Sequence, residues 1–387
     1  MKSWNNSANF WFLIEPYVYI KITNNCVLLY NTLDGVTLES AKTEVIQLIN
    51  NYIKKENCGV ILLSNDQYSN NHINDFISEL REKYMGDIIN VNLSNEKPVQ
   101  ILPYFNFLND SNLYKKHNFL QQKDLFDKLS QINIHVDSTT SVTKLVTFLL
   151  TIQGSLTFNI IGNMAEVENY NVLLSFFNQH TAPKTMISSY KDVIALQPTY
   201  ENDFSYQISS HFPVNMQQWN KSRMILIHQT LPIEYVFDVT SDEDCIQAEN
   251  IVEKSHIEKY RLNPVYTGDN ISFFEENVFL HRKDILFIQL TIKDIFARQA
   301  MNIYDFGKIN IMPNGDVYAN VNFPSLGNIE TDNIYEIIQK EIEEGKSWFR
   351  IRNHAPCDDC VYQWLCPSPS NYEIEIGRPN LCHVRNL

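Results

Sequence analysis

Glycine is scarce in this chain of 387 residues, which contains only 11 glycines. Loops that cradle phosphate groups depend on closely spaced glycines, and the sequence has no phosphate-loop, dinucleotide-binding or nucleophile-elbow motif. The H-E-x-x-H motif of zinc proteases is also missing. The motifs that most often reveal nucleotide binding, serine hydrolysis or zinc proteolysis are therefore absent.

Basic residues are also fewer than acidic ones: the chain has 31 Lys and Arg against 45 Asp and Glu, which gives a net charge of -14. An acidic surface repels phosphate backbones, so we expect no nucleic-acid partner. No run of 18 apolar residues occurs, and Glu15 and Pro16 interrupt the apolar stretch near the start. We therefore expect no membrane span, no signal peptide and a cytoplasmic protein.

The length suggests two or three domains. Changes in the pattern of predicted strands and helices divide the chain into residues 1–96, 97–300 and 301–387. In the first segment "YVYIKI" and "CVLLYNTL" alternate around a polar turn and predict a hairpin. Ser40 is expected to cap a helix, "GVILLS" predicts a buried strand, and "INDFISELREKY" predicts a second helix. The apolar side of the first helix is expected to carry Val45, Ile46, Leu48, Ile49 and Ile53. This outline fits a winged-helix-like module, and it fits a capping domain without a ligand equally well.

The second segment alternates strand and helix patterns, which predicts an α/β fold with a parallel sheet or an open partial (β/α) barrel. Helical stretches such as "VENYNVLLSFFNQH" and "EDCIQAENIVEKS" lie between strand candidates. The six candidates are residues 131–136, 155–161, 184–189, 205–210, 233–239 and 260–266.

The third segment begins with two short alternating runs joined by Asn314-Gly315, a strong hairpin signal, and continues with a helix expected from Asp332 to Glu344. Four cysteines then follow in the spacing C-x2-C-x5-C-x15-C. A C-x2-C pair presents two sulfurs on one tight turn, and two further thiolates complete a tetrahedral zinc site or the corners of a cubane iron–sulfur cluster. The expected metal ligands are Cys357, Cys360, Cys366 and Cys382.

Cys26, Cys58 and Cys245 are isolated in the sequence and are expected to be ordinary core residues. The clustered thiols would stay reduced in the cytoplasm, where such clusters more often bind metal than form disulfides. The spacing alone leaves zinc and iron–sulfur open.

The tail "CDDCVYQWLCPSPSNYE…GRPNLC", with "INIMPNGDVYANVNFPSLGNI" before it, resembles a SPASM domain, the auxiliary-cluster domain of radical-SAM peptide-modifying enzymes. With "FWFLIEPYVYI" and "LLYNTLDG" near the start, the whole chain resembles the pseudo-radical-SAM proteins of the GG-Bacteroidales peptide systems. The grasp-with-SPASM maturases share a similar tail and are the nearest alternative.

This resemblance implies a radical-SAM-type partial barrel followed by a SPASM-like domain with one [4Fe–4S] cluster on the four cysteines, with structural zinc as the alternative. A second SPASM cluster would need cysteines where this chain has Asn320 and Asp332, around Gly327, and Ser370 stands where a further one is expected. One cluster site is therefore expected to be kept and the other lost.

The C-x3-C-x2-C triplet that binds the radical-SAM cluster occurs nowhere in the chain. After the first barrel strand the sequence reads "DSTTSVTK", and the family's glycine-rich S-adenosylmethionine contact is reduced to Gly162-Asn163. Hydroxyls do not replace thiolates as cluster ligands, so we expect no S-adenosylmethionine and no catalytic residue of that kind.

Two sets of polar residues are candidates for acid–base chemistry: His135 with Asp137, and His211 with Glu234 and Asp238. No nucleophile or metal spacing accompanies them, so each is expected to be structural. His383 could serve as a substitute ligand beside Cys382, but four cysteines already suffice.

The resemblance implies a non-catalytic accessory protein in the maturation of ribosomally made peptides. Its partners would be a precursor or leader peptide, an active radical-SAM maturase, or both. The peptide would add as an extra strand to the N-terminal hairpin, since an open strand edge offers unpaired N–H and C=O groups. The alternatives are a redox-active maturase that relays electrons through the tail cluster, and a structural protein stapled by zinc.

Overall fold

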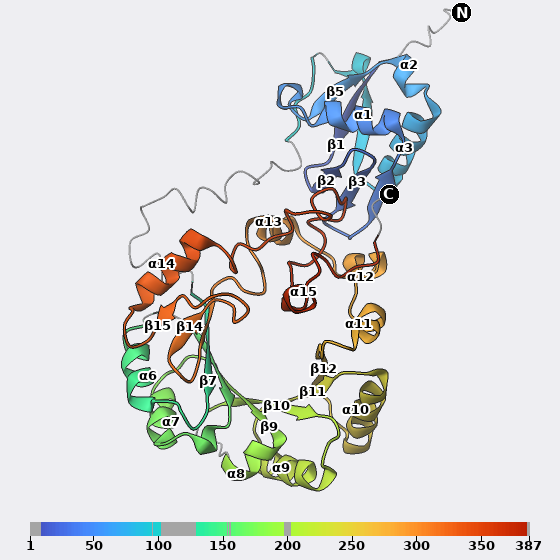
Figure 1. Cartoon of the computed structure of the whole chain (residues 1–387). Coiled ribbons are helices and arrows are strands. Elements are labelled where there is room, and N and C mark those ends of the chain that lie inside the picture. The colour runs from blue at the N-terminus through green and yellow to red at the C-terminus, as the bar shows by residue number, and fades with distance from the viewer. Residues whose placement is uncertain are drawn as a thin grey trace, which may run out of the picture.

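The computed structural model describes residues 9–94, 96–101, 129–152, 154, 156–196 and 203–384. Figure 1 shows an N-terminal α+β unit above a curved sheet with helices on its outer side, and the last part of the chain, which contains α15, lies between the two. The chain is thus a mixed α/β protein built around a sheet of nine mostly parallel strands. In the described part no helix combines the length and apolar character that a membrane crossing requires.

The N-terminal unit contains two antiparallel sheets, each of three strands, in the orders β5-β1-β6 and β2-β3-β4. The predicted hairpin is confirmed as β2 and β3, with Ile22 opposite Val27. Its strands are β1 (Phe10–Ile14), β2 (Val18–Ile22), β3 (Val27–Asn31), β4 (Thr37–Ser40), β5 (Val60–Leu63) and β6 (Gly86–Asn90), and its helices are α1 (Thr43–Tyr52), α2 (Asn65–Tyr68), α3 (Asn71–Glu82) and the short 3-10 turns η1 (Lys55–Asn57) and η2 (Val91–Leu93).

Both predicted helices of this unit form, but two details of α1 were wrong. Ser40 ends β4, and α1 instead begins after Lys42, which makes no side-chain capping hydrogen bond. Ile53 lies beyond the helix end and is 43% exposed, whereas Tyr52 points into the core and is fully buried. The interpretation of the unit as a winged-helix-like peptide-recognition domain stays a prediction.

All six strand candidates of the middle segment are confirmed as parallel neighbours in chain order, β12-β11-β10-β9-β8-β7. Helices follow the strands and cover one face of the sheet (Figure 1). The elements are β7 (Gln131–Val136), α6 (Val142–Leu149), β8 (Thr157–Gly162), η4 (Met164–Glu166), α7 (Tyr170–Asn178), β9 (Lys184–Ser189), α8 (Tyr190–Leu196), β10 (Ser205–His211), α9 (Met216–His228), β11 (Ile233–Val239), α10 (Asp242–Ser255) and β12 (Tyr260–Pro264).

The C-terminal segment extends the same sheet, because β13 pairs in parallel with β7 and continues into β14 and β15. The predicted hairpin at Asn314-Gly315 is confirmed by antiparallel pairing of Ile311 with Val317. The predicted helix is α14, which begins two residues later than expected because Asn333 caps it. The elements are α11 (Ile271–Asn277), α12 (Arg282–Phe287), α13 (Ile292–Ala300), β13 (Lys308–Ile311), β14 (Asp316–Tyr318), β15 (Gly327–Asn328), α14 (Ile334–Glu344) and α15 (Asn371–Ile376).

One apolar cluster joins the N-terminal unit to the C-terminal segment. Side chains of the hairpin pack there with residues of α12, α13 and the cysteine-containing loop. The hydrophobic contacts between residues so distant in sequence make the hairpin and this loop parts of one core. The buried members are Tyr19, Cys26, Leu28, Tyr30, Ile285, Leu290, Ile295, Ile351, Val361, Tyr362, Trp364, Leu365 and Cys366.

Candidate metal centre and the degenerate barrel

The four C-terminal cysteines converge on one small cavity. Backbone hydrogen bonds wind the loop that carries the first three, from Cys360 N to Cys357 O at 3.2 Å and from Cys366 N to Tyr362 O at 2.8 Å. Cys382 arrives from the chain end, where it bridges in parallel to Leu280. All four sulfur-bearing residues line the same cavity, and their role as metal ligands stays a prediction.

The donor set fits a thiophilic metal, because four thiols line this cavity and no carboxylate or imidazole does. The cavity measures ≈ 20 Å³, which is room for about one water-sized ion. In the described part of the chain no three His, Cys, Asp or Glu side chains are already spaced as a metal-binding group. Ligation would therefore require the thiols to move relative to one another.

Burial favours the protonated form of three of these thiols. Burial raises the pKa of Cys366 to about 12, an effect that the nearby Arg352 opposes. Burial also raises the pKa of Cys357 and of Cys360. Because a metal binds thiolates, its uptake by these cysteines would release protons and create a negatively charged centre.

Cations from separate parts of the chain surround the thiols. Arg352 is only 6% exposed, places Nη1 3.7 Å from Cys357 Sγ and pairs through Nη2 with Glu373 Oε1 at 3.0 Å. Burial lowers the pKa of Arg352, but Cys366, Glu373 and Cys357 together raise it above its ordinary value. Burial lowers the pKa of Lys21, which Cys360 and nearby aspartates partly oppose. Such cations would balance the charge of a metal–thiolate centre.

The sequence did not reveal these basic residues. The net charge of the chain is -14, so a basic residue only five positions before Cys357 was the one hint in the sequence that Arg352 lies near the thiols. Lys21 gave none, since it lies hundreds of positions from the cysteines. Of the other cysteines, Cys26 is buried as expected, but Cys58 is exposed. The prediction of Cys58 as a core residue was wrong, because it ends a surface 3-10 turn in the left-handed conformation, with φ of 50°.

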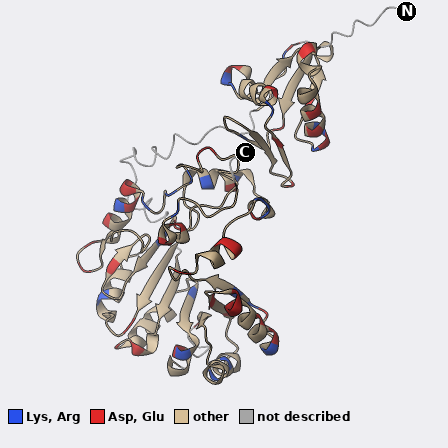
Figure 2. Ribbon diagram, turned by 45° about the vertical axis from the view of Figure 1, so that its right-hand side comes forward, with Lys and Arg blue, Asp and Glu red and all other residues tan. Residues whose placement is uncertain are grey.

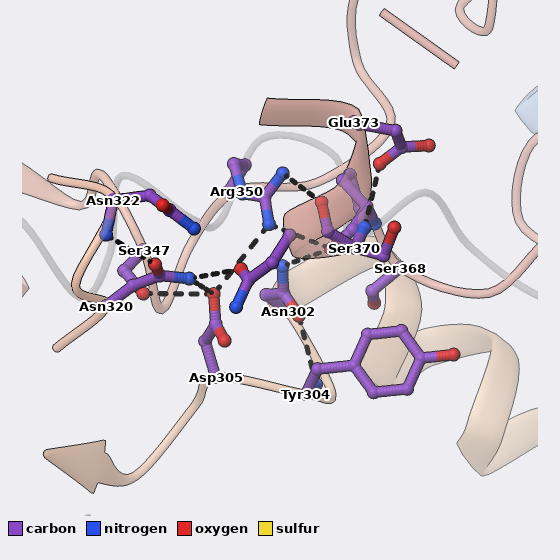
Figure 3. A network of polar contacts seen from close by, with 12 residues as sticks. Asn302, Tyr304, Asp305, Asn320, Asn322, Ser347, Arg350, Ser368, Ser370 and Glu373 are labelled. Carbon is purple, nitrogen blue, oxygen red and sulfur yellow. Dashed lines mark hydrogen bonds and ion pairs between the residues drawn. The ribbon is translucent and has the colours of Figure 1, made fainter. Parts of the chain in front are cut away.

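The positions where further cluster cysteines would stand are filled by a polar network (Figure 3). Asn320 donates from Nδ2 to Asp305 Oδ2 at 3.0 Å, and Ser347 Oγ donates to the same oxygen at 3.0 Å. Arg350 lies 3.8 Å from that oxygen and also donates to the Pro369 and Ser370 carbonyls. These contacts tie the loop after Cys366 to the hairpin end without any sulfur.

Ser370 and Asp332 also have structural partners. The Ser370 N–H donates to Glu373 Oε2 at 2.7 Å in the capping box of α15. Asp332 accepts a hydrogen bond from Asn328 N at 2.9 Å. Both side chains therefore serve local turns of the backbone.

The loop after β7 closes on itself. Asp137 Oδ1 accepts hydrogen bonds from the Thr139 N–H at 2.7 Å and from its hydroxyl at 2.6 Å, and Asp137 N donates to Thr140 Oγ1 at 3.0 Å. At the end of β8, Gly162 has φ of +126°, and an added Cβ would lie 2.2 Å from Val136 O. These residues build tight turns with hydroxyl and carboxylate groups, none of which is a cluster ligand.

The face of the sheet that points away from the helices is polar. Asn133 bridges its neighbours, donating from Nδ2 to Asn310 Oδ1 at 2.9 Å and accepting from Asn159 Nδ2 at 3.0 Å. The alternate residues, such as Ile132 and Ile134, are fully buried in the core. In the ribbon of Figure 2, few positions on these strands are coloured as charged residues compared with the helices. The partly exposed polar residues of this face include Gln131, Asn133, His135, Thr157, Asn159, Thr185, Ser189, Gln207 and Ser209.

The structure brings together only some residues of the two acid–base candidates. His211 Nδ1 lies 3.2 Å from Asp238 Oδ2, but Glu234 instead accepts from Gln207 Nε2 at 2.7 Å. His135 interacts with Asn310 while Asp137 serves its own turn, and burial lowers the pKa of His135. The interpretation of these residues as structural stays a prediction.

His383 contacts the barrel linker instead of the thiols. Its Nε2–H donates to Glu275 O at 2.7 Å, and its ring stacks on His281 with ring centroids 4.4 Å apart. It lines a neighbouring cavity of ≈ 340 Å³, shared with Cys360, Cys26 and Arg282. Cys360 thus lies between this larger cavity and the one lined by the four thiols.

No protein-family model and no curated protein matches this sequence. Among solved structures, the chain is similar to one titled "Native anSMEcpe with bound AdoMet and Cp18Cys peptide", at 11% identity and a TM-score of 0.43, over 61% of this chain and 88% of that one. It is also similar to Streptococcus suis SuiB bound to precursor peptide SuiA, at 11% identity and a TM-score of 0.37, over 96% of this chain and 99% of that one. Both likenesses are distant.

Proposed function

We propose that this chain is a non-catalytic, radical-SAM-like accessory protein that binds a precursor peptide, an active radical-SAM maturase, or both during peptide maturation. The observation that carries the proposal is a contrast between two loops. The loop after β7 is a closed turn of hydroxyl and carboxylate groups, whereas the C-terminal loop brings four cysteines to one cavity. The pseudo-radical-SAM resemblance of the sequence supplies the biological setting.

Cys357, Cys360, Cys366 and Cys382 would hold the metal, and an iron–sulfur cluster bound there would accept and donate single electrons. The chain's own residues bury Cys357 and Cys366 and place Arg352 beside the Cys357 sulfur. The polar face of the sheet offers amide and hydroxyl groups to a polar ligand such as a peptide main chain.

The hairpin cannot offer either of its faces to a peptide. One face packs into the core of the N-terminal unit through Val18, Ile20 and Leu29, and the other packs against the cysteine loop through Leu28 and Tyr30. A bound peptide would therefore pair with a strand edge of the sheet β2-β3-β4.

Anaerobic affinity purification of the tagged full chain from its host, with mass spectrometry of co-purifying material, tests the accessory role. Recovery of a precursor peptide or a radical-SAM maturase supports it. Recovery of the chain alone at comparable yield would contradict it.

The metal centre has its own test, with Cys58 as a matched control because it is exposed and outside the cavity. Replacing both Cys357 and Cys360 by Ser is expected to reduce bound metal at least about ten-fold, since two of four thiolates are lost. Cys58→Ser should leave the metal content unchanged. Equal metal content in all variants would exclude this site.

Two alternatives make different predictions for the same samples. The small cavity favours a single zinc ion that only staples the tail. The larger cavity beside Cys360 favours a redox role, because it gives a partner access to one ligand of the centre. Visible absorption that bleaches with dithionite supports the cluster, and colourless protein with stoichiometric zinc supports the staple.

A further inference from the structure

A chain of hydrogen bonds leads from the N-terminal hairpin to the cysteine loop. Lys21 on β2 donates from Nζ to Gln363 Oε1 at 2.5 Å, and Gln363 donates from Nε2 to Arg352 O at 2.5 Å. Arg352 in turn lies against Cys357 Sγ and donates from Nε to Pro367 O. Lys21 and Gln363 are 342 positions apart, so the contact belongs to the tertiary fold.

Gln363 is the central member of this chain. It lies inside the cysteine loop between Cys360 and Cys366 and is only 5% exposed. A buried amide that loses a partner costs free energy, because no water replaces the lost hydrogen bond. The position of the loop and the position of Lys21 are therefore linked through one side chain.

Further contacts hold the same two parts together around this chain. Glu39 on β4 accepts hydrogen bonds from Tyr362 Oη at 2.8 Å and from Arg282 Nη2 at 2.6 Å. Tyr30 on β3 accepts a hydrogen bond from Leu290 N at 2.7 Å. Three strands of one sheet thus contact the cysteine loop or the helices beside it.

We propose that Lys21 and Gln363 are positioning residues that couple docking of the N-terminal hairpin to metal binding by the four cysteines. The inference rests on the proposed metal site. A metal–thiolate centre adds negative charge and fixes the conformation of the loop. Both changes strengthen the attraction between the loop and the Lys21 ammonium. By linkage, a docked hairpin raises the affinity for metal by the same factor.

Hydrogen–deuterium exchange on the full chain tests the coupling. The protein is stripped with a chelator and reloaded to saturation with Zn²⁺, or with ferrous iron and sulfide under anaerobic conditions. Loading is expected to slow amide exchange in β2 and β3 about ten-fold, because these strands open less often when docked.

Lys21→Met keeps the length of the side chain but removes its charge. It should take up the same amount of metal at saturation but lose most of the slowing in β2 and β3. Lys54→Met is the control, since Lys54 is an exposed residue of the same unit, and it should behave like the wild type. Lys21→Arg should restore the coupling.

The outcomes separate the two proposals. Metal uptake by the wild type without slower exchange in β2 and β3 would overturn the coupling but leave the metal site standing. Equal slowing in Lys21→Met and the wild type would also overturn it. A wild-type chain that takes up neither metal form would overturn the metal site and the coupling together.

Discussion

Among the single residues, Glu341 of α14 combines a carboxyl group with nearly complete burial, at 2% exposed. Its Oε1 accepts hydrogen bonds from Ser347 N at 2.8 Å and from Trp348 N at 2.7 Å. Burial raises the pKa of this carboxyl group, and the two hydrogen bonds only partly oppose that effect. The group therefore favours the folded state most when it is protonated.

The pKa shift gives Glu341 a signed effect on stability. A folded pKa above the unfolded value contributes stability that is fully present below the unfolded pKa and lost as the pH rises through the folded pKa. Glu341→Gln keeps an acceptor oxygen and removes the charge. The melting temperature of this variant, relative to that of the wild type, should therefore rise as the pH increases from 4.5 to 8.

Thermal unfolding across that pH range measures the effect, with Glu249→Gln at an exposed position of α10 as the control. The difference between wild type and control should stay flat with pH. A difference between wild type and Glu341→Gln that is also flat would contradict the assignment of the shift to burial.

At the scale of helices and strands, the sequence was informative where a pattern is local. The six barrel strands were predictable because buried apolar residues such as Ile132 and Ile134 alternate with polar ones and helices separate the strands. The hairpin at Asn314-Gly315 was predictable because only a few residues accept a positive φ, here +89° at Gly315.

Other features of the elements depend on distant partners and were not predictable. The start of α1 shifted past Ser40 because β4 uses that residue to pair with Val27 of β3. Likewise, the four cysteines were identified from their spacing, but the contacts of Lys21 and Arg352 with their surroundings arise only when the whole chain has folded.

The end of β8 provides a prediction at this scale. Gly162→Ala would place a Cβ 2.2 Å from Val136 O on β7, which should destabilise the fold by about 2 kcal/mol or more through clash and backbone strain. Gly154→Ala is a matched control, because Gly154 has the same φ of +126° and no atom of the described residues lies within 4 Å of an added Cβ.

Thermal or denaturant unfolding of both variants separates strain from clash. The control should lose only the strain of the unfavourable φ, about 1 kcal/mol. Equal losses in both variants would show that the close approach of β7 and β8 does not restrict this position.

At the scale of the whole molecule, the hairpin β2-β3 packs against the cysteine loop, although the two are far apart in the sequence. The sheet β2-β3-β4 and the cysteine loop share one apolar cluster, and charged and polar contacts border it. An interface of this kind makes the N-terminal unit and the tail cooperative, since each leaves apolar surface exposed when the other departs. A partner that moves the N-terminal unit would therefore also act on the cysteine loop.

Glu39 tests this cooperativity at the border of the cluster. Its side chain is 15% exposed and bonds both Arg282 and Tyr362, so it joins three distant segments. Because Arg282 is 58% exposed, solvent screens part of the attraction, and Glu39→Gln should cost about 1 kcal/mol. Glu79→Gln is the control, since Glu79 pairs with Lys83 four positions later on the surface at the end of α3. This substitution should cost less than about 0.5 kcal/mol.

Hydrogen exchange decides whether the loss spreads beyond the mutated strand. If the two parts are cooperative, Glu39→Gln should accelerate exchange both in β4 and in the loop around Tyr362, although 323 positions separate the two residues. Glu79→Gln should affect only the neighbourhood of α3. Faster exchange in β4 with an unchanged cysteine loop would mean that the two parts open independently.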